Sequence, residues 1–158
     1  MSAFTFNESN EAHFNALLTR YPKKDSLMLP SLWMAQYQEG WVSPPAMEYI
    51  AQKLECSPMD VYAVASFYTM FNLKPVGTYH IQLCKTLSCM LRGSQKMQAH
   101  IETKLGITPG QTTKDGKFTF TLVECLGSCG SAPCMSFNED YKENLTLQTL
   151  DALIEEAK

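Results

Sequence analysis

The chain has 158 residues, 45% of them hydrophobic, which is enough for one ordinary core or for a small helical unit joined to an α/β unit. Its 13 basic and 16 acidic residues give a formal charge of -3 and are spread along the chain, so a nucleic-acid partner is not expected. Residues 1–14 lack the marks of a signal or transit peptide, and the longest apolar stretch is too short to span a bilayer, so we expect a cytoplasmic protein without membrane insertion.

The first part of the chain carries the signals of four short helices. Apolar residues recur there at the spacing of one helix face. Two of the helices begin at a Ser-Pro pair, Ser43–Pro44 and Ser57–Pro58, in which the serine can cap the first turn. Ser26 is expected to cap another, and Gly40 to follow its end. The predicted helices cover about residues 9–21, 26–39, 43–54 and 57–68.

From residue 76 onward the pattern changes to strands that alternate with helices. Residues 78–84 alternate apolar and polar positions, and residues 118–123 follow a turn at Asp115 and Gly116. We also expect a helix over about residues 91–105, a strand near 134–137 and a last helix from Thr146. This order predicts an α/β (α+β) fold with helices on a small mixed sheet, and two domains at 1–75 and 76–158.

Six cysteines stand out in a chain that shows no sign of secretion. Such thiols are more typical of metal ligands, catalytic groups or buried small side chains than of three disulfides. Cys84 and Cys89 follow the end of one predicted strand, and Cys125 and Cys129 follow the end of another. If these strands are neighbours, their carboxyl ends lie about 5 Å apart, or about 10 Å with one strand between them. All four thiols then converge on one rim of the sheet.

Four thiols at one rim favour a [2Fe-2S] cluster, in which two thiolates complete each tetrahedral iron. The loop near Gly127 and Gly130 suits such a cofactor, because glycine lets backbone N–H groups approach the sulfurs. A structural zinc site has the same donors but usually shows C-x2-C pairs. A thiol-disulfide oxidoreductase would show C-x-x-C, which is absent, and buried thiols without a metal are a further alternative.

Two other cysteines are interpreted differently. Cys134 also forms a C-x4-C pair with Cys129, but Pro133 and the strand that follows predict that Cys134 points into the core rather than at a metal. Cys56 lies at the end of a predicted helix and is interpreted as a structural or free thiol.

The chain shows no dinucleotide or nucleotide triphosphate motif, and its three histidines have no spacing that suggests acyl transfer. His80, on a predicted strand, is expected to be packed or partly exposed. We therefore expect no complete active site on this chain, and any hydride chemistry must come from a partner.

Several segments resemble the thioredoxin-like [2Fe-2S] subunit of NADH:quinone oxidoreductase, respiratory complex I, which is the small E subunit of the bacterial enzyme. Related subunits occur in NAD-linked hydrogenases and formate dehydrogenases. The likeness covers nearly the whole chain after about residue 10. The matching segments are VYAVASFYTMF, CKTLSCMLRGS, GITPGQTTKDGKFT, ECLGSCGSAP and NEDYKENLT.

The resemblance implies a helical bundle followed by a thioredoxin-like domain that holds one [2Fe-2S] cluster through Cys84, Cys89, Cys125 and Cys129. It implies a non-catalytic redox subunit that takes single electrons from the FMN of an NADH-oxidising flavoprotein subunit. The location implied is cytoplasmic, peripheral to the inner membrane through the parent complex. An equivalent subunit of a hydrogenase or formate dehydrogenase, or a zinc-stabilised interaction module, is the alternative. The sequence departs from the family mainly at Cys134, where an apolar residue is more common.

Overall fold

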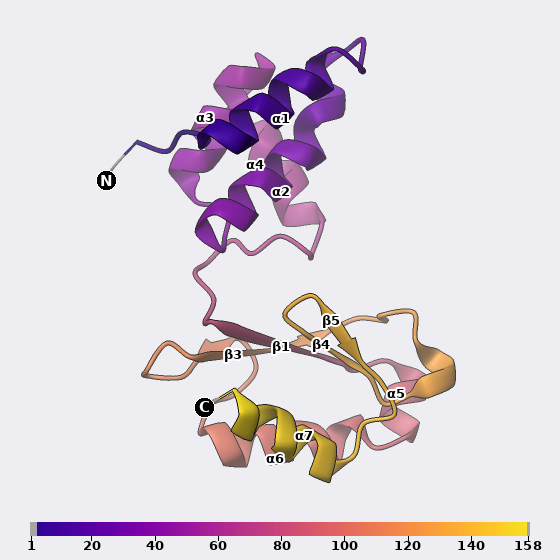
Figure 1. Ribbon diagram of the computed structural model, residues 1–158. Helices are drawn as coiled ribbons and strands as arrows, with labels where there is room; N and C mark the ends of the chain where they lie inside the picture. The colour runs from indigo at the N-terminus through magenta and orange to yellow at the C-terminus, as the bar shows by residue number, and fades with distance from the viewer. Residues whose placement is uncertain (1–2, 158) are drawn as a thin grey trace. The chain divides into compact units, whose positions relative to one another are not determined.

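The computed structural model describes residues 3–157, which divide into two compact units between Pro75 and Val76. The N-terminal unit is entirely helical in its regular structure (Figure 1). Its elements are α1 (Glu8–Leu18), the 3-10 turn η1 (Lys24–Leu27), α2 (Met28–Glu39), α3 (Pro44–Leu54) and α4 (Pro58–Phe67).

The helix starts of this unit follow from local capping chemistry. The Ser43 hydroxyl accepts a hydrogen bond from the Ala46 N–H at the start of α3. Ser57 caps α4 in a reciprocal box with Asp60, so both predicted Ser-Pro starts are confirmed. The predicted cap at Ser26 is wrong, because η1 leads directly into α2 and leaves Ser26 inside an already helical turn. At the other end of α2, Gly40 adopts the left-handed conformation that terminates the helix (φ 81°).

The helical unit has its own hydrophobic core. Helix α3 packs against both α2 and α4 and contributes the fully buried Ile50 to the centre. Leu32 of α2 and Val61 of α4 are also fully buried, while Phe14 brings α1 onto the same cluster. Among residues 3–157, no helix is both long enough and apolar enough to cross a membrane.

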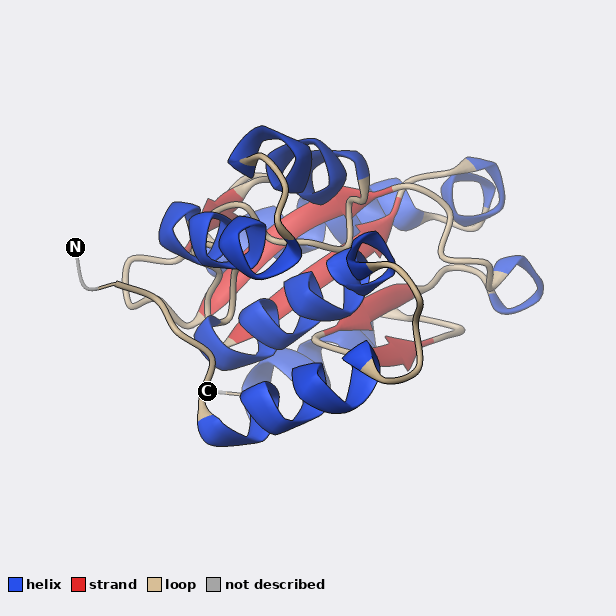
Figure 2. Cartoon of the chain, turned by 90° about the horizontal axis from the view of Figure 1, so that it is seen from above, coloured by secondary structure: helices blue, strands red, loops and turns tan. Residues whose placement is uncertain are grey.

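The C-terminal unit is a mixed five-stranded sheet with order β2-β3-β1-β4-β5 (strands red in Figure 2). Strand β1 lies in the middle, parallel to β3 and antiparallel to β4. Helices α6 and α7 lie side by side on one face of this sheet (Figure 1). The elements are β1 (Tyr79–Cys84), α5 (Leu87–Leu91), α6 (Ser94–Leu105), β2 (Gln111–Thr112), β3 (Phe118–Val123), the 3-10 turn η2 (Cys129–Ser131), β4 (Met135–Phe137), β5 (Asp140–Lys142) and α7 (Leu147–Glu156).

The core under the sheet explains why the strands align as they do. Ile81, Phe120 and Met135, one residue from each of the three inner strands, are fully buried and pack against Leu150 and Ile154 of α7. A one-residue slip of any strand would turn these side chains to the other face. A parallel pair also needs a long crossover connection, which α5 and α6 provide between β1 and β3.

The predicted strands at 78–84, 118–123 and 134–137 are confirmed as β1, β3 and β4, and the α/β fold class is confirmed with them. The helix predicted over about residues 91–105 begins later, at Ser94, and a separate short helix, α5, precedes it. The two helices are separated because Gly93 adopts a left-handed φ of 97° that breaks the helical path. Strands β2 and β5 were not predicted, because they are only two and three residues long.

His80 lies in β1 and is buried, with Nε2 2.9 Å from Oγ1 of Thr121. Burial lowers the pKa of His80 to about 4. The side chain is therefore a neutral, packed histidine at pH 7, as the sequence analysis expected.

This buried histidine predicts a loss of stability in mild acid. Between pH 6.5 and pH 4 the unfolded chain binds a proton at His80 and the folded chain does not, so the free energy of unfolding falls as the pH falls. The full effect is roughly 3 kcal/mol, of which roughly 2 kcal/mol is lost between about pH 7 and pH 5. Denaturant unfolding at the two pH values measures it. A His80→Gln variant should lose roughly 2 kcal/mol less over this interval, and an equal loss in both proteins would contradict the prediction.

Candidate metal centre

The carboxyl ends of β1 and β3 meet at one edge of the sheet because the strands are parallel. Cys84, the last residue of β1, lies opposite Val123, the last residue of β3. The pairing continues one residue further, where the Lys85 N–H donates to the Val123 carbonyl over 3.0 Å. The Lys85 ammonium and the Glu124 carboxylate lie 2.8 Å apart, an exposed pair that contributes little free energy. This register brings Cys84 and Cys125 to neighbouring strand ends.

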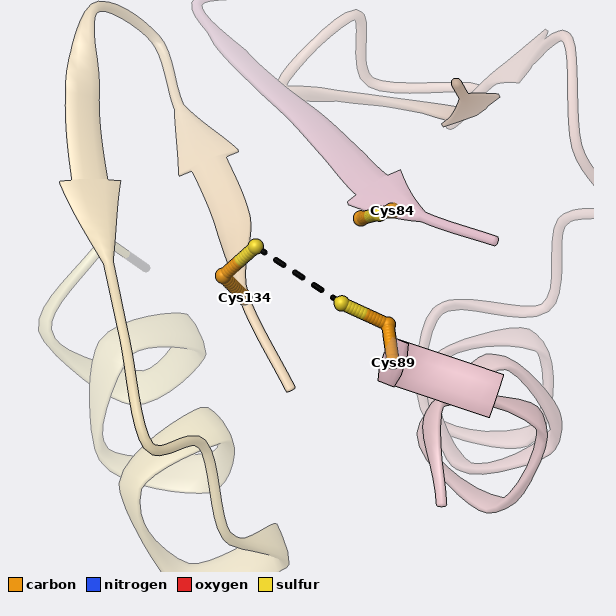
Figure 3. Close-up of side chains that lie close together, drawn as sticks. All are labelled: Cys84, Cys89 and Cys134. Atoms are coloured by element: carbon orange, nitrogen blue, oxygen red, sulfur yellow. Dashed lines mark hydrogen bonds between the residues drawn. The ribbon is translucent and has the colours of Figure 1, made fainter. Parts of the chain in front are cut away.

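Cys84, Cys89 and Cys134 form a buried group of three thiols. Their sulfur atoms all lie within 4.8 Å of one another, and each residue is at most 2% exposed. Figure 3 shows the side chains of Cys89 and Cys134 pointing toward one another from α5 and from the segment before β4. Their sulfurs are 3.7 Å apart. We call these three residues the buried thiol group.

Cys125 and Cys129 form a second, exposed pair on the loop after β3. Their sulfurs lie 3.7 Å apart. The loop turns at Gly127, whose φ of 82° is the left-handed conformation that glycine adopts without strain. The Gly127 N–H donates to the Cys125 sulfur over 3.3 Å. The loop therefore supplies both thiols and a backbone donor directed at one of them.

Thr86 connects the two groups of thiols. Its hydroxyl lies 3.2 Å from the Cys84 sulfur and also interacts with the Cys125 sulfur. Although Thr86 precedes α5, its side chain makes no capping hydrogen bond to that helix, because the hydroxyl is turned to sulfur instead. The backbone of Leu126, in the other loop, interacts with the Cys84 sulfur. The buried thiol group and the exposed pair are thus parts of one site.

The thiols differ in how readily they lose a proton. Burial opposes ionisation of Cys84, but hydrogen bonds from Thr86 outweigh it and lower the pKa of Cys84. The Gly127 N–H lowers the pKa of Cys125. Burial raises the pKa of Cys89 and raises that of Cys134 to about 12. Proton loss from Cys134 is therefore strongly disfavoured.

The structure brings each predicted pair of cysteines together and places both at the same edge of the sheet. It corrects the interpretation of Cys134, which is buried as expected but faces the other thiols. The reason is the antiparallel pairing of β4 with β1, which starts β4 where β1 ends, so that the Cys84 N–H donates to the Cys134 carbonyl over 3.2 Å. Cys56 packs against the core of the N-terminal unit. Thr86 was not predicted as part of the site, since nothing in its spacing in the sequence marks it.

The donors at this site suit an iron–sulfur cluster. Soft thiolates are the ligands that such clusters use, and backbone N–H and hydroxyl donors near the sulfurs stabilise the thiolate form. The structure supplies both, in Cys84, Cys125 and their neighbours Thr86 and Gly127. Glycine at 127 and 130 leaves open space beside the loop, since a Cβ at either position would meet nothing within 4 Å. The site therefore fits a [2Fe-2S] cluster.

Comparison with known proteins gives the same cofactor. The family model that matches residues 14–158 is that of the thioredoxin-like [2Fe-2S] ferredoxin. The chain belongs to this family. Its cofactor is a [2Fe-2S] cluster, and the resemblance inferred from the sequence is confirmed.

Among curated relatives, the chain is 46% identical over 140 residues to the second E subunit of the NADH-quinone oxidoreductase of Rhizobium meliloti, covering 89% of this chain and 83% of that one. It is 47% identical over 156 residues to the NADH-quinone oxidoreductase E subunit of Rickettsia felis, covering 97% and 93%. A solved NAD+-reducing [NiFe]-hydrogenase matches with a TM-score of 0.74 and 25% identity. That match covers 83% of this chain but only 22% of the hydrogenase chain.

Proposed function

We propose that this chain is an electron-transfer subunit of an NADH:quinone oxidoreductase. Its one [2Fe-2S] cluster exchanges single electrons with the FMN of a partner flavoprotein that oxidises NADH. The observation that carries the proposal is the meeting of two cysteine pairs at the carboxyl ends of β1 and β3. The curated relatives, which are E subunits of NADH-quinone oxidoreductases and match over most of their length, support the parent complex.

The ligands in this proposal are Cys84, Cys89, Cys125 and Cys129. A thiol must lose its proton to bind iron, so the lowered pKa values of Cys84 and Cys125 favour their role. Burial raises the pKa of both Cys89 and Cys134, that of Cys134 to about 12, so Cys134 is the less suitable ligand of these two. Cys89 is taken as the second ligand beside Cys84 because it occupies the C-x4-C position after Cys84 that the resemblance assigns to a ligand, while the sulfurs of Cys84, Cys89 and Cys134 all lie within 4.8 Å of one another.

The protein environment of the site suits one-electron exchange. When bound, the cluster supplies the one-electron chemistry. The buried thiol group keeps water from one side of the site, while the exposed Cys125 and Cys129 leave the other side open toward the surface. Donors such as the Gly127 N–H and the Thr86 hydroxyl stabilise negative charge on sulfur and so favour the reduced state.

A partner surface next to the site is part of the proposal. Leu87 and Leu91 of α5, on either side of Cys89, are 65% and 75% exposed. Exposed leucines of this kind suit a protein contact better than open solvent. The flavoprotein subunit is the proposed partner, and the proposed location is cytoplasmic and peripheral to the inner membrane. We also propose that residues 1–75 and 76–158 are separate domains, the second of which holds the cluster.

An equivalent role in an NAD-linked hydrogenase is the second candidate. The fold match to the NAD+-reducing [NiFe]-hydrogenase favours it, because the matched part is a segment of a larger redox protein. The lower identity of that match, 25% against 46% for the oxidoreductase subunit, places it second.

The ligand assignment predicts which cysteines the cluster requires. Serine at position 84, 89, 125 or 129 should abolish or strongly destabilise the cluster, because a hydroxyl is a poorer iron ligand than a thiolate. Visible absorption, with iron and acid-labile sulfide in equal amounts in the wild type, measures this loss. Cys56→Ser and Cys134→Ser are the matched controls and should keep the red-brown colour. A colourless protein that carries one zinc, isolated without air or chelator, would support a zinc-stabilised module instead.

The partner assignment predicts that NADH alone does not reduce the purified chain. NADH should bleach the visible absorption of the cluster only after the flavoprotein subunit is added. The reason is that NADH donates its hydride to the FMN of the partner, which then passes single electrons to the cluster. Anaerobic spectroscopy of the chain alone, the flavoprotein alone and their mixture measures this. Rapid reduction by NADH without the flavoprotein would contradict the assignment.

A further inference from the structure

Cys134 adds a fifth thiol to a site whose proposed ligands number four. Its sulfur lies 3.7 Å from the Cys89 sulfur, a distance at which a thiol can donate a hydrogen bond to sulfur (Figure 3). Both residues are at most 2% exposed, so water does not compete for this contact. The contact therefore links Cys89, a proposed ligand, to Cys134, which is not a proposed ligand.

The backbone holds Cys134 in this position. The Cys84 N–H donates to the Cys134 carbonyl over 3.2 Å, and the Leu145 N–H donates to the neighbouring Pro133 carbonyl over 3.0 Å. The cysteine directly precedes β4, which pairs with the central strand β1. Ala132 and Leu126 belong to the same small cluster, so the surroundings of the two thiols are largely apolar. The sheet thus fixes the backbone position from which the Cys134 side chain reaches Cys89.

We propose that the Cys134 S–H donates a hydrogen bond to the Cys89 sulfur when Cys89 ligates the cluster, and thereby raises the cluster's reduction potential. This proposal rests on the proposed function, because it takes Cys89 and not Cys134 as the ligand. Cys134 acts through Cys89 and does not itself contact iron.

The physical reason is the charge that reduction adds. One electron enters the site, no bond breaks and no proton is transferred, so the thiolate sulfurs carry more negative charge after reduction than before. A donor beside one of these sulfurs stabilises the reduced state more than the oxidised state. The net worth of a hydrogen bond suggests an effect of roughly three- to tenfold on the equilibrium constant for reduction. A tenfold change corresponds to about 59 mV for a one-electron couple.

The test compares Cys134→Ala with Cys134→Ser in the full chain loaded with its cluster. Iron and sulfide content is measured first, and the reduction potential then follows from a redox titration monitored by electron paramagnetic resonance. Alanine removes the donor, so the equilibrium constant for reduction should fall roughly three- to tenfold. Serine keeps a donor at the same position, so its equilibrium constant for reduction should lie clearly closer to the wild-type value than that of Cys134→Ala. A purely structural role for Cys134 would not separate the two variants in this way.

Two results would overturn the inference, and they separate a failure of the hydrogen bond from a failure of the proposed ligand set. Equal reduction potentials in the wild type and in Cys134→Ala, each with a full cluster, would show that Cys134 does not raise the potential through a hydrogen bond. Loss of the cluster in both position-134 variants, with retention in Cys89→Ser, would show that the ligand set itself is wrong.

A measurement on the wild type decides the case even if the variants fold poorly. The S–H stretching band in the infrared shifts to lower frequency when the thiol donates a hydrogen bond. The cluster-loaded wild type should show such a shifted band, and a Cys56→Ser variant should keep it, since Cys56 packs against the core of the N-terminal unit. Absence of a shifted band in the cluster-loaded wild type would contradict the inference.

Discussion

The parallel pairing of β1 and β3 is the constraint on which the site depends. Because the two strands point the same way, the residues that follow them emerge at the same edge, and each emerging segment carries a cysteine pair. An antiparallel pairing would send the segments that follow the two strands to opposite ends of the sheet. The buried residues Ile81 and Phe120 fix the register by packing onto α7, so the core of the C-terminal unit is also what aligns the thiols.

The thiols of the site also differ in their environment. Cys84 and Cys89 sit in a buried, largely apolar setting, while Cys125 and Cys129 lie on an exposed loop that turns at Gly127. A cluster held between them would have one protected side and one side near the surface. Protection limits access of water, and a side near the surface lets an electron pass to a docked partner.

Much of this arrangement could be predicted from the sequence because it depends on local signals. The alternation over 78–84 and the turn before 118–123 predicted the two strands, and the cysteine pairs that follow them could be placed at one edge on the condition that the strands are neighbours, which the pairing of β1 with β3 meets. The position of Cys134 could not, because it depends on which strand β4 pairs with, a tertiary choice that no local pattern records. Thr86 could not be predicted for a similar reason, since its contact with sulfur depends on how the loop after β1 folds and nothing in its spacing marks it.

The most direct test of the central claim is the crystal structure of the cluster-loaded chain, with the irons located by their anomalous scattering. We expect two irons at the carboxyl ends of β1 and β3, bound by the sulfurs of Cys84, Cys89, Cys125 and Cys129, with the Cys134 sulfur beside Cys89 and unligated. Iron bound by Cys134 in place of one of these four, or a single metal ion at this edge, would contradict it.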